Sequence, residues 1–194
     1  MPRRPDPSIR RGLRDRAVDY VLAHGFAELS LRPLAKELGT NARMLVYHFG
    51  SREGLMRAIL GGLREREDAR IRSWFSSARR PRTIAQFVRW YWRRLTAPDA
   101  RSAGKLIFEL YALALRDPQS YPGVLEDPVG YWKQLLERAG MPPTPRSDVL
   151  ATVLLATMRG LLLDLLATGD EKRVTRAMSA MLRMLAIPEA TRRS

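Results

Sequence analysis

The chain has 194 residues, enough for one substantial core or for a small domain joined to a larger one. It carries 34 basic and 20 acidic residues, a formal net charge of +14, which favours a polyanionic partner without specifying a fold. Cysteine is absent, which excludes disulfides and thiolate metal sites and is compatible with the cytoplasm. Because only four of the basic residues are lysine, a GC-rich coding sequence is an equally good explanation of the charge.

The N-terminal part predicts a short arm followed by an amphipathic helix. Residues 1–6 are basic but precede no unbroken apolar stretch, so we expect a solvated arm rather than a signal peptide. From Ser8 to His24, apolar residues recur at spacings of three and four, and Gly25 can end the helix. The residues of this apolar stripe are Ile9, Leu13, Ala17, Tyr20 and Val21.

Residues 29–55 predict two short helices joined by a tight turn and followed by a longer helix, which is a helix-turn-helix. Ser30 can cap the first short helix, although Pro33 in its first turn predicts a ragged start. Gly39 can end that helix in a positive-φ conformation. Asn41 can cap the second short helix, Ala42 to Phe49.

Gly50 stops this second helix, and Ser51 caps the longer one, which runs to about residue 76 and connects the two parts of the chain. A helical projection divides the second short helix into two faces. We expect Ala42, Leu45, His48 and Phe49 to pack, and Arg43, Val46 and Tyr47 to project outward.

These residues resemble the TetR family of bacterial transcriptional regulators. The likeness is carried by Ser30-Leu31-Arg32, Leu34-Ala35, Leu38-Gly39, Leu45-Val46-Tyr47-His48-Phe49 and Ser51-Arg52-Glu53-Gly54-Leu55. It covers about the first quarter of the chain, and it departs from the family at Val46, where a DNA-contacting tyrosine is usual. The resemblance implies an all-α fold, with an N-terminal helix-turn-helix domain followed by a helical-bundle domain for ligand binding and dimerisation.

Beyond a hinge at residues 76–82, further helices are expected over 83–95, 98–115 and 129–138. Residues 147–168 are apolar almost all round, which is typical of a core, a membrane span or an interface. Arg159 and Asp164 within them argue against a membrane span. Together with residues 171–185, this helix from each of two subunits would form a four-helix bundle, as in TetR-like homodimers. The expected domains are 1–55, with the connecting helix 51–76, and 77–194.

The expected partner of the helix-turn-helix is a double-stranded operator with dyad symmetry, bound by a homodimer. Arg43 is the candidate for guanine readout, with a phosphate contact as the alternative, whereas a structural or phosphate-contacting role is favoured for His48. The candidate DNA-binding residues are Ser30, Thr40, Asn41, Ala42, Arg43, Val46, Tyr47, His48 and Arg52.

The resemblance also implies a small-molecule pocket among the C-terminal helices, so that a hydrophobic or amphipathic effector would release a repressor from DNA. From spacing alone, a filled core is the better explanation for each residue taken singly. The candidate ligand-binding residues are Phe87, Tyr91, Trp92, Phe108, Tyr111, Tyr131, Trp132 and Met158.

Two other classes of function were weighed against the sequence. An enzyme is disfavoured, because the chain has no cysteine, only two distant histidines and no glycine-rich phosphate loop. No cofactor or metal is expected. The alternative is a basic all-α protein that binds nucleic acid without sequence preference or serves as a scaffold.

Overall fold

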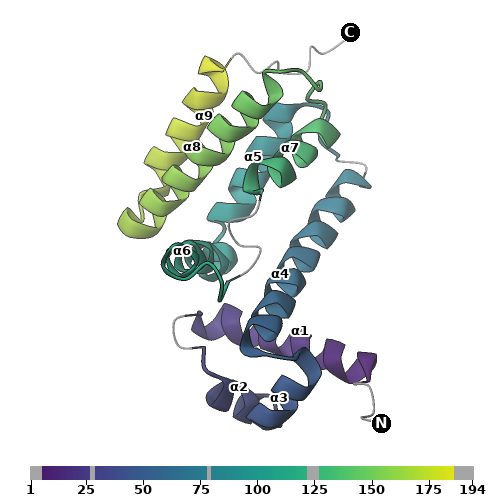
Figure 1. Cartoon of the computed structure of the whole chain (residues 1–194). Coiled ribbons are helices and arrows are strands. Elements are labelled where there is room, and N and C mark those ends of the chain that lie inside the picture. The colour runs from purple at the N-terminus through teal and green to yellow at the C-terminus, as the bar shows by residue number, and fades with distance from the viewer. Residues whose placement is uncertain (1–5, 27–28, 78–79, 122–126, 186–194) are drawn as a thin grey trace. The chain divides into compact units, whose positions relative to one another are not determined.

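The computed structural model describes residues 6–26, 29–77, 80–121 and 127–185. The predicted N-terminal arm therefore lies almost wholly outside the described residues. Within the described ranges the chain is helical and contains no strand (Figure 1). The elements are α1 (Pro7–His24), α2 (Leu31–Glu37), α3 (Ala42–Phe49), α4 (Arg52–Phe75), α5 (Ile84–Thr96), the 3-10 turn η1 (Pro98–Ala100), α6 (Arg101–Arg116), α7 (Pro128–Arg138), α8 (Ser147–Thr168) and α9 (Glu171–Met184).

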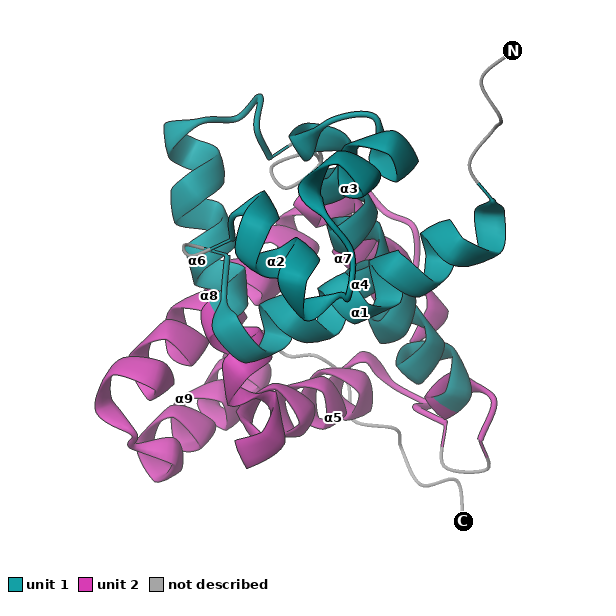
Figure 2. Cartoon of the chain, turned by 90° about the horizontal axis from the view of Figure 1, so that it is seen from below, with its two compact units in different colours: residues 1–73, 106–126 teal, residues 74–105, 127–194 magenta. Residues whose placement is uncertain are grey.

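The chain divides into two compact units (Figure 2). Unit 1 contains residues 1–73 and 106–126, and unit 2 contains residues 74–105 and 127–194. The division differs from the sequence-based one, which assigned everything after residue 76 to the second domain. Most of α6 belongs to unit 1, because Leu106, Leu110 and Ala114 are buried in the core that α1 helps to form.

The core of unit 1 joins apolar faces of α1, α2, α3, α4 and α6. Leu34, Leu45 and Ile59 are fully buried, as the spacing of apolar residues predicts. Ile9 is the exception, since its side chain is 52% exposed. The prediction for Ile9 was wrong because the buried part of α1 begins one turn later, at Leu13; Val18 is fully buried instead.

Ion pairs join α1 to the charged stretch of α4. Arg14 Nη1 lies 2.9 Å from a carboxylate oxygen of Glu65, and Arg66 Nη1 lies 2.6 Å from Asp19 Oδ1. Residues 64–70 carry charges of both signs, a pattern typical of an exposed, salt-bridged length of helix. Because these side chains are at least partly exposed, each pair contributes little to stability, about 0–1 kcal/mol.

Two neighbouring glycines of α4 should respond oppositely to alanine. A Cβ at Gly62 would lie 2.8 Å from Val18 Cγ2, whereas a Cβ at Gly61 would have nothing within 4 Å. Gly61→Ala is expected to stabilise the protein by about 0.5–1 kcal/mol, because alanine loses less conformational entropy in a helix. Gly62→Ala should gain the same stabilisation of the helix. Its new methyl group would, however, lie too close to Val18, and this overpacking costs about 1–3 kcal/mol of stability.

Urea unfolding of the two variants, followed by circular dichroism, measures this difference. Equal free energies of unfolding for Gly61→Ala and Gly62→Ala would contradict the close packing of α1 on α4.

Unit 2 is organised around α8, which packs against α5, α7 and α9. Helices α8 and α9 run side by side and antiparallel (Figure 1). Arg173 of α9 donates to both carboxylate oxygens of Asp164 on α8, at 2.6 and 2.8 Å. This bidentate pair holds the pKa of Asp164 below its ordinary value.

Candidate nucleic-acid interface

The turn between α2 and α3 is built from backbone hydrogen bonds around a glycine. Thr40 N donates to Ala35 O at 2.8 Å, and Gly39 N donates to Lys36 O at 3.1 Å. This pair of bonds is a Schellman motif, which requires the left-handed conformation that Gly39 adopts with φ of 64°. The turn therefore ends α2 and fixes where α3 begins.

Both ends of α3 are as the sequence predicts. Asn41 Oδ1 accepts from Met44 N at 3.0 Å, which caps the first turn. Gly50 ends the helix with φ of 83°. Helix α4 then begins with a cap in which Ser51 Oγ accepts from Gly54 N at 3.0 Å. Hydrogen bonds from its own backbone amide and from Ser51 hold the pKa of Glu53 below its ordinary value.

Ser30 does not cap α2 with its side chain, and the sequence-based prediction was wrong on this point. Pro33 contributes to this, because it occupies the third helical position and removes one of the two backbone N–H donors that such a cap can use. The helix nevertheless begins directly at Leu31 rather than raggedly. The Ser30 side chain is exposed.

Helix α3 has one packed face and one exposed face. Leu45, His48 and Phe49 are buried, as expected. The exposed face carries Arg43, together with Val46 and Tyr47, whose side chains are 39% and 43% exposed, and Met44, which is 38% exposed. Met44 was not predicted, although its place three residues before Tyr47 puts it at the edge of this face.

His48 belongs to the packed face. Its side chain is 7% exposed, and its Nδ1 has no hydrogen-bond partner among the described residues. Its backbone oxygen accepts from Arg10 Nε at 3.1 Å, and the same guanidinium lies 5.4 Å from the centre of the Phe49 ring. The imidazole is therefore packed inside the motif, and Arg10 of α1 contacts the end of α3 through the His48 backbone and the Phe49 ring.

The other candidate DNA-binding residues surround the exposed face in sequence. Asn41 is exposed, and Thr40, Ala42 and Arg52 are half-buried. Two basic side chains that the sequence analysis did not select, Arg32 and Lys36, are also exposed on α2. They are candidates for phosphate contacts, because basic side chains on the helix before the recognition helix face the DNA backbone in this motif.

The candidate ligand-binding residues divide between the two units. Phe108 and Tyr111 lie in unit 1, and the other six lie in unit 2. In unit 2 the Trp132 ring lies 5.5 Å from Phe87 and 5.0 Å from Tyr91, measured between centroids. Trp92 has a structural role, because its Nε1 donates to Thr175 Oγ1 at 3.1 Å and joins α5 to α9.

Trp132 differs from Trp92 in its hydrogen bonding. Both side chains are 2% exposed, but Trp132 Nε1 has no partner among the described residues. Buried indole N–H groups usually find an acceptor, so this donor is an unusual feature within a group of aromatic rings. Aromatic residues outside the predicted set extend the group, since Trp74 stacks on Trp90 at 4.1 Å with 7° between the ring planes.

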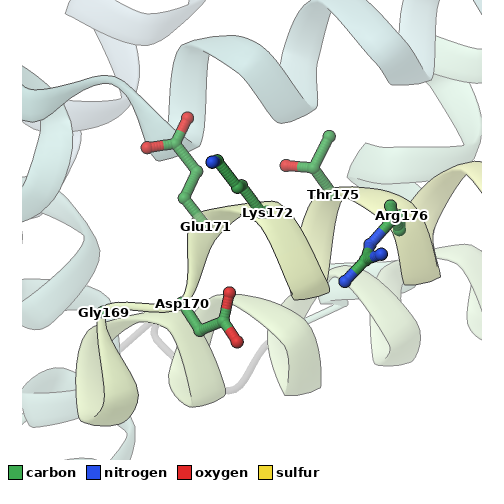
Figure 3. A pocket seen from close by; sticks show the side chains of 6 residues that line it. All are labelled: Gly169, Asp170, Glu171, Lys172, Thr175 and Arg176. Atoms are coloured by element: carbon green, nitrogen blue, oxygen red, sulfur yellow. The ribbon is translucent and has the colours of Figure 1, made fainter.

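Two surface hollows in unit 2 are lined by other residues. One is formed by Gly169 and the first turns of α9, where Figure 3 shows the side chains of both charge signs that surround it. The second is lined by Trp74, Pro81, Gln86 and four arginines.

Comparison with known protein families finds a match for the helix-turn-helix part of the chain. Residues 13–59, from α1 into α4, match the sequence model of the bacterial regulatory proteins of the tetR family. No curated protein sequence matches the chain significantly.

Solved structures match nearly the whole chain. The multidrug binding protein EbrR, complexed with imidazole, is 28% identical with a TM-score of 0.66, and the match covers 98% of this chain and 96% of EbrR. A putative TetR-family transcriptional regulator from Rhodococcus sp. is 16% identical with a TM-score of 0.69, covering 93% of this chain and all of the other. The fatty acid degradation regulator FadR from Bacillus halodurans is 16% identical with a TM-score of 0.58, covering 94% and 96%.

The two distant matches show the same fold, and the family model matches the part of the chain that forms the helix-turn-helix. These findings confirm the resemblance seen in the sequence and the all-α architecture. Residues 13–59 of the chain therefore form a helix-turn-helix of the tetR-family type, and the chain as a whole is similar to EbrR.

Proposed function

We propose that this regulator is a repressor that binds a palindromic operator as a homodimer and leaves it when a small hydrophobic or amphipathic effector binds. The observation that carries the proposal is the exposed face of α3. Its cap and its stop are fixed by Asn41 and Gly50, and Arg43, Met44, Val46 and Tyr47 project from it. A short, rigidly held helix with such a face fits the major groove of B-DNA.

The DNA-contacting residues divide by chemistry. Arg43 can pair with O6 and N7 of guanine, and Val46 and Met44 can contact only apolar groups such as a thymine methyl. We assign phosphate contacts to Ser30, Thr40, Tyr47 and Arg52, of which Arg52 lies in the first turn of α4, where backbone N–H groups favour an anion.

The exposed side of α8 supports the homodimer. Residues at alternating spacings of four and three along this helix are exposed and are all apolar or small. This is the spacing by which one helix packs against another, and the small residues permit a close approach. The stripe consists of Val149, Val153, Ala156, Gly160, Leu163 and Ala167, and we call it the α8 stripe.

The α8 stripe also explains the apolar character of this helix. Among the described residues, α8 is long and apolar enough to cross a membrane by length and composition, and only 28% of its most apolar window is buried. A partner subunit, with α9 beside α8 in each protomer, would cover this surface and keep the regulator in the cytoplasm with its operator.

The aromatic side chains of unit 2 support the proposal that a small-molecule effector binds there. A ligand with an acceptor group that entered among the rings of Phe87, Tyr91 and Trp132 would satisfy the buried Trp132 Nε1. The 28% identical EbrR is a multidrug binding protein, crystallised with imidazole and, in another crystal structure, with proflavin. To act as an inducer, the effector must bind the DNA-free conformation more tightly than the bound one.

Selection of bound duplexes from a random pool tests the proposed function. We expect enriched sites with dyad symmetry and half-site centres about 34–36 Å apart or more, and release of the protein by a small hydrophobic or amphipathic compound that does not itself bind DNA. Sequence-independent binding with a steep salt dependence and no preferred palindrome would instead favour a non-specific nucleic-acid-binding protein, as the net charge of +14 allows.

If Val46 contacts a thymine, the affinity for the operator should depend on the C5 methyl group of that one thymine. Replacing each thymine of a half-site by deoxyuridine removes only the C5 methyl. We expect one replacement to weaken binding by about 0.8 kcal/mol, roughly fourfold, because it removes one buried apolar group. The variant Val46→Ala should bind both duplexes equally in fluorescence anisotropy titrations. Retained sensitivity in this variant would contradict the assignment.

A further inference from the structure

The arginine-lined hollow of unit 2 has an unusual charge balance. Trp74, Arg80, Arg82, Gln86, Arg89 and Arg93 line it, and none of its lining residues is acidic. The sequence from residue 69 to residue 98 contains eight arginines and no aspartate or glutamate. Several guanidinium groups thus face one hollow without a neighbouring carboxylate in the same stretch of chain.

Most of these guanidinium groups have no internal ion-pair partner. Arg94, outside the hollow, lies 3.6 Å from Asp99. By contrast, among the described residues no ion pair involves Arg80, Arg82 or Arg93, whose side chains are exposed. Cations gathered in this way repel one another, and an anion in the hollow would relieve that repulsion.

The other polar group of the hollow also offers donors. Gln86 Oε1 already accepts from Arg82 N at 2.7 Å, so the side-chain amide presents its NH₂ end for further bonds. Thr83 caps α5, with its Oγ1 accepting from Gln86 N at 3.2 Å, which fixes the backbone that carries these groups. The hollow therefore presents donors and positive charge, the chemistry that recognises carboxylate or phosphate.

Trp74 contributes a flat aromatic surface to the lining of the hollow. Its indole is half-buried and stacked on Trp90, and its backbone oxygen accepts from Ser77 Oγ at 2.8 Å. Arg80 N in turn donates to Ser77 O at 3.1 Å, so the segment that carries Arg80 is tied to the end of α4. An aromatic ring beside several guanidinium groups is suited to a ligand that combines a planar ring with a negative charge.

We propose that this hollow is a binding site for a small planar organic anion, a ring that bears a carboxylate or a phosphate. It is lined by different residues from Phe87, Tyr91 and Trp132, and its binding of an anion can be tested without an operator. Because Trp74 lies in the last turn of α4, a bound anion would contact the helix that begins directly after α3.

Calorimetric titration of the full chain tests the proposal with four probes: 1-naphthoate, 1-naphthyl phosphate, neutral 1-naphthalenemethanol and inorganic phosphate. We expect one or both naphthyl anions to bind, with the tighter one identifying the anionic group, and the neutral alcohol and inorganic phosphate to bind at least about tenfold more weakly. The double variant Arg82→Gln/Arg93→Gln should lose at least about tenfold in affinity for the naphthyl anion.

The matched control is Arg72→Gln/Arg101→Gln, which removes the same charge from exposed residues outside the hollow. It should change the affinity less than twofold. The proposal is overturned if neither naphthyl anion binds at millimolar concentration, if the neutral alcohol or inorganic phosphate binds as tightly, or if the control loses as much affinity as the double variant.

Discussion

Replacing Arg43 by alanine is expected to weaken binding to the selected operator by about 1–3 kcal/mol, roughly five- to 150-fold. The guanidinium is exposed near the start of α3, where a planar fork of donors can pair with O6 and N7 of one guanine. Its loss should therefore also remove the preference for that base. Fluorescence anisotropy titrations with the operator and its single-base variants measure both effects.

Arg52→Ala is the control for this experiment. Arg52 is assigned a phosphate contact, so its replacement should weaken binding to every duplex alike and reduce the salt dependence of the affinity. If both variants lost affinity equally on every duplex, Arg43 would not read a base.

Two charged substitutions in the α8 stripe are expected to convert the protein to a monomer. Val153 and Leu163 are 38% and 52% exposed, so Val153→Glu and Leu163→Glu place carboxylates where two subunits would pack. Buried without partners, these charges oppose association. Because operator affinity depends on two linked helix-turn-helix units, it should fall by about 10²- to 10⁴-fold. Sedimentation equilibrium and operator titration measure the two effects.

Leu115→Glu provides the matched control. Leu115 is 71% exposed at the end of α6, outside the α8 stripe, so this variant should remain dimeric and keep its affinity for the operator. Circular dichroism checks that all variants retain their helices. A Val153→Glu/Leu163→Glu variant that stayed dimeric at micromolar concentration would disprove α8 as the interface.

The sequence by itself determined the helix-turn-helix, because its signals are local. Asn41, Gly39 and Gly50 mark the ends of α3 through caps and positive-φ turns, which depend on a few neighbouring residues. Periodicity then distinguished the packed Leu45 from the exposed Arg43. The weakness of Ser30 as a cap was also within reach of the sequence, since Pro33 removes one of the two N–H groups that such a cap can use.

Only the tertiary structure decided which helix faces meet. Leu106 and Leu110 could have been buried in either unit, and contacts distant in sequence placed them with α1. The same holds for Trp132 Nε1, which has no partner in the part of the chain that is described, for the four arginines around one hollow and for the exposed α8 stripe. Periodicity tells which side of a helix is apolar, but the burial of that side depends on how much neighbouring surface the folded chain has available to cover it.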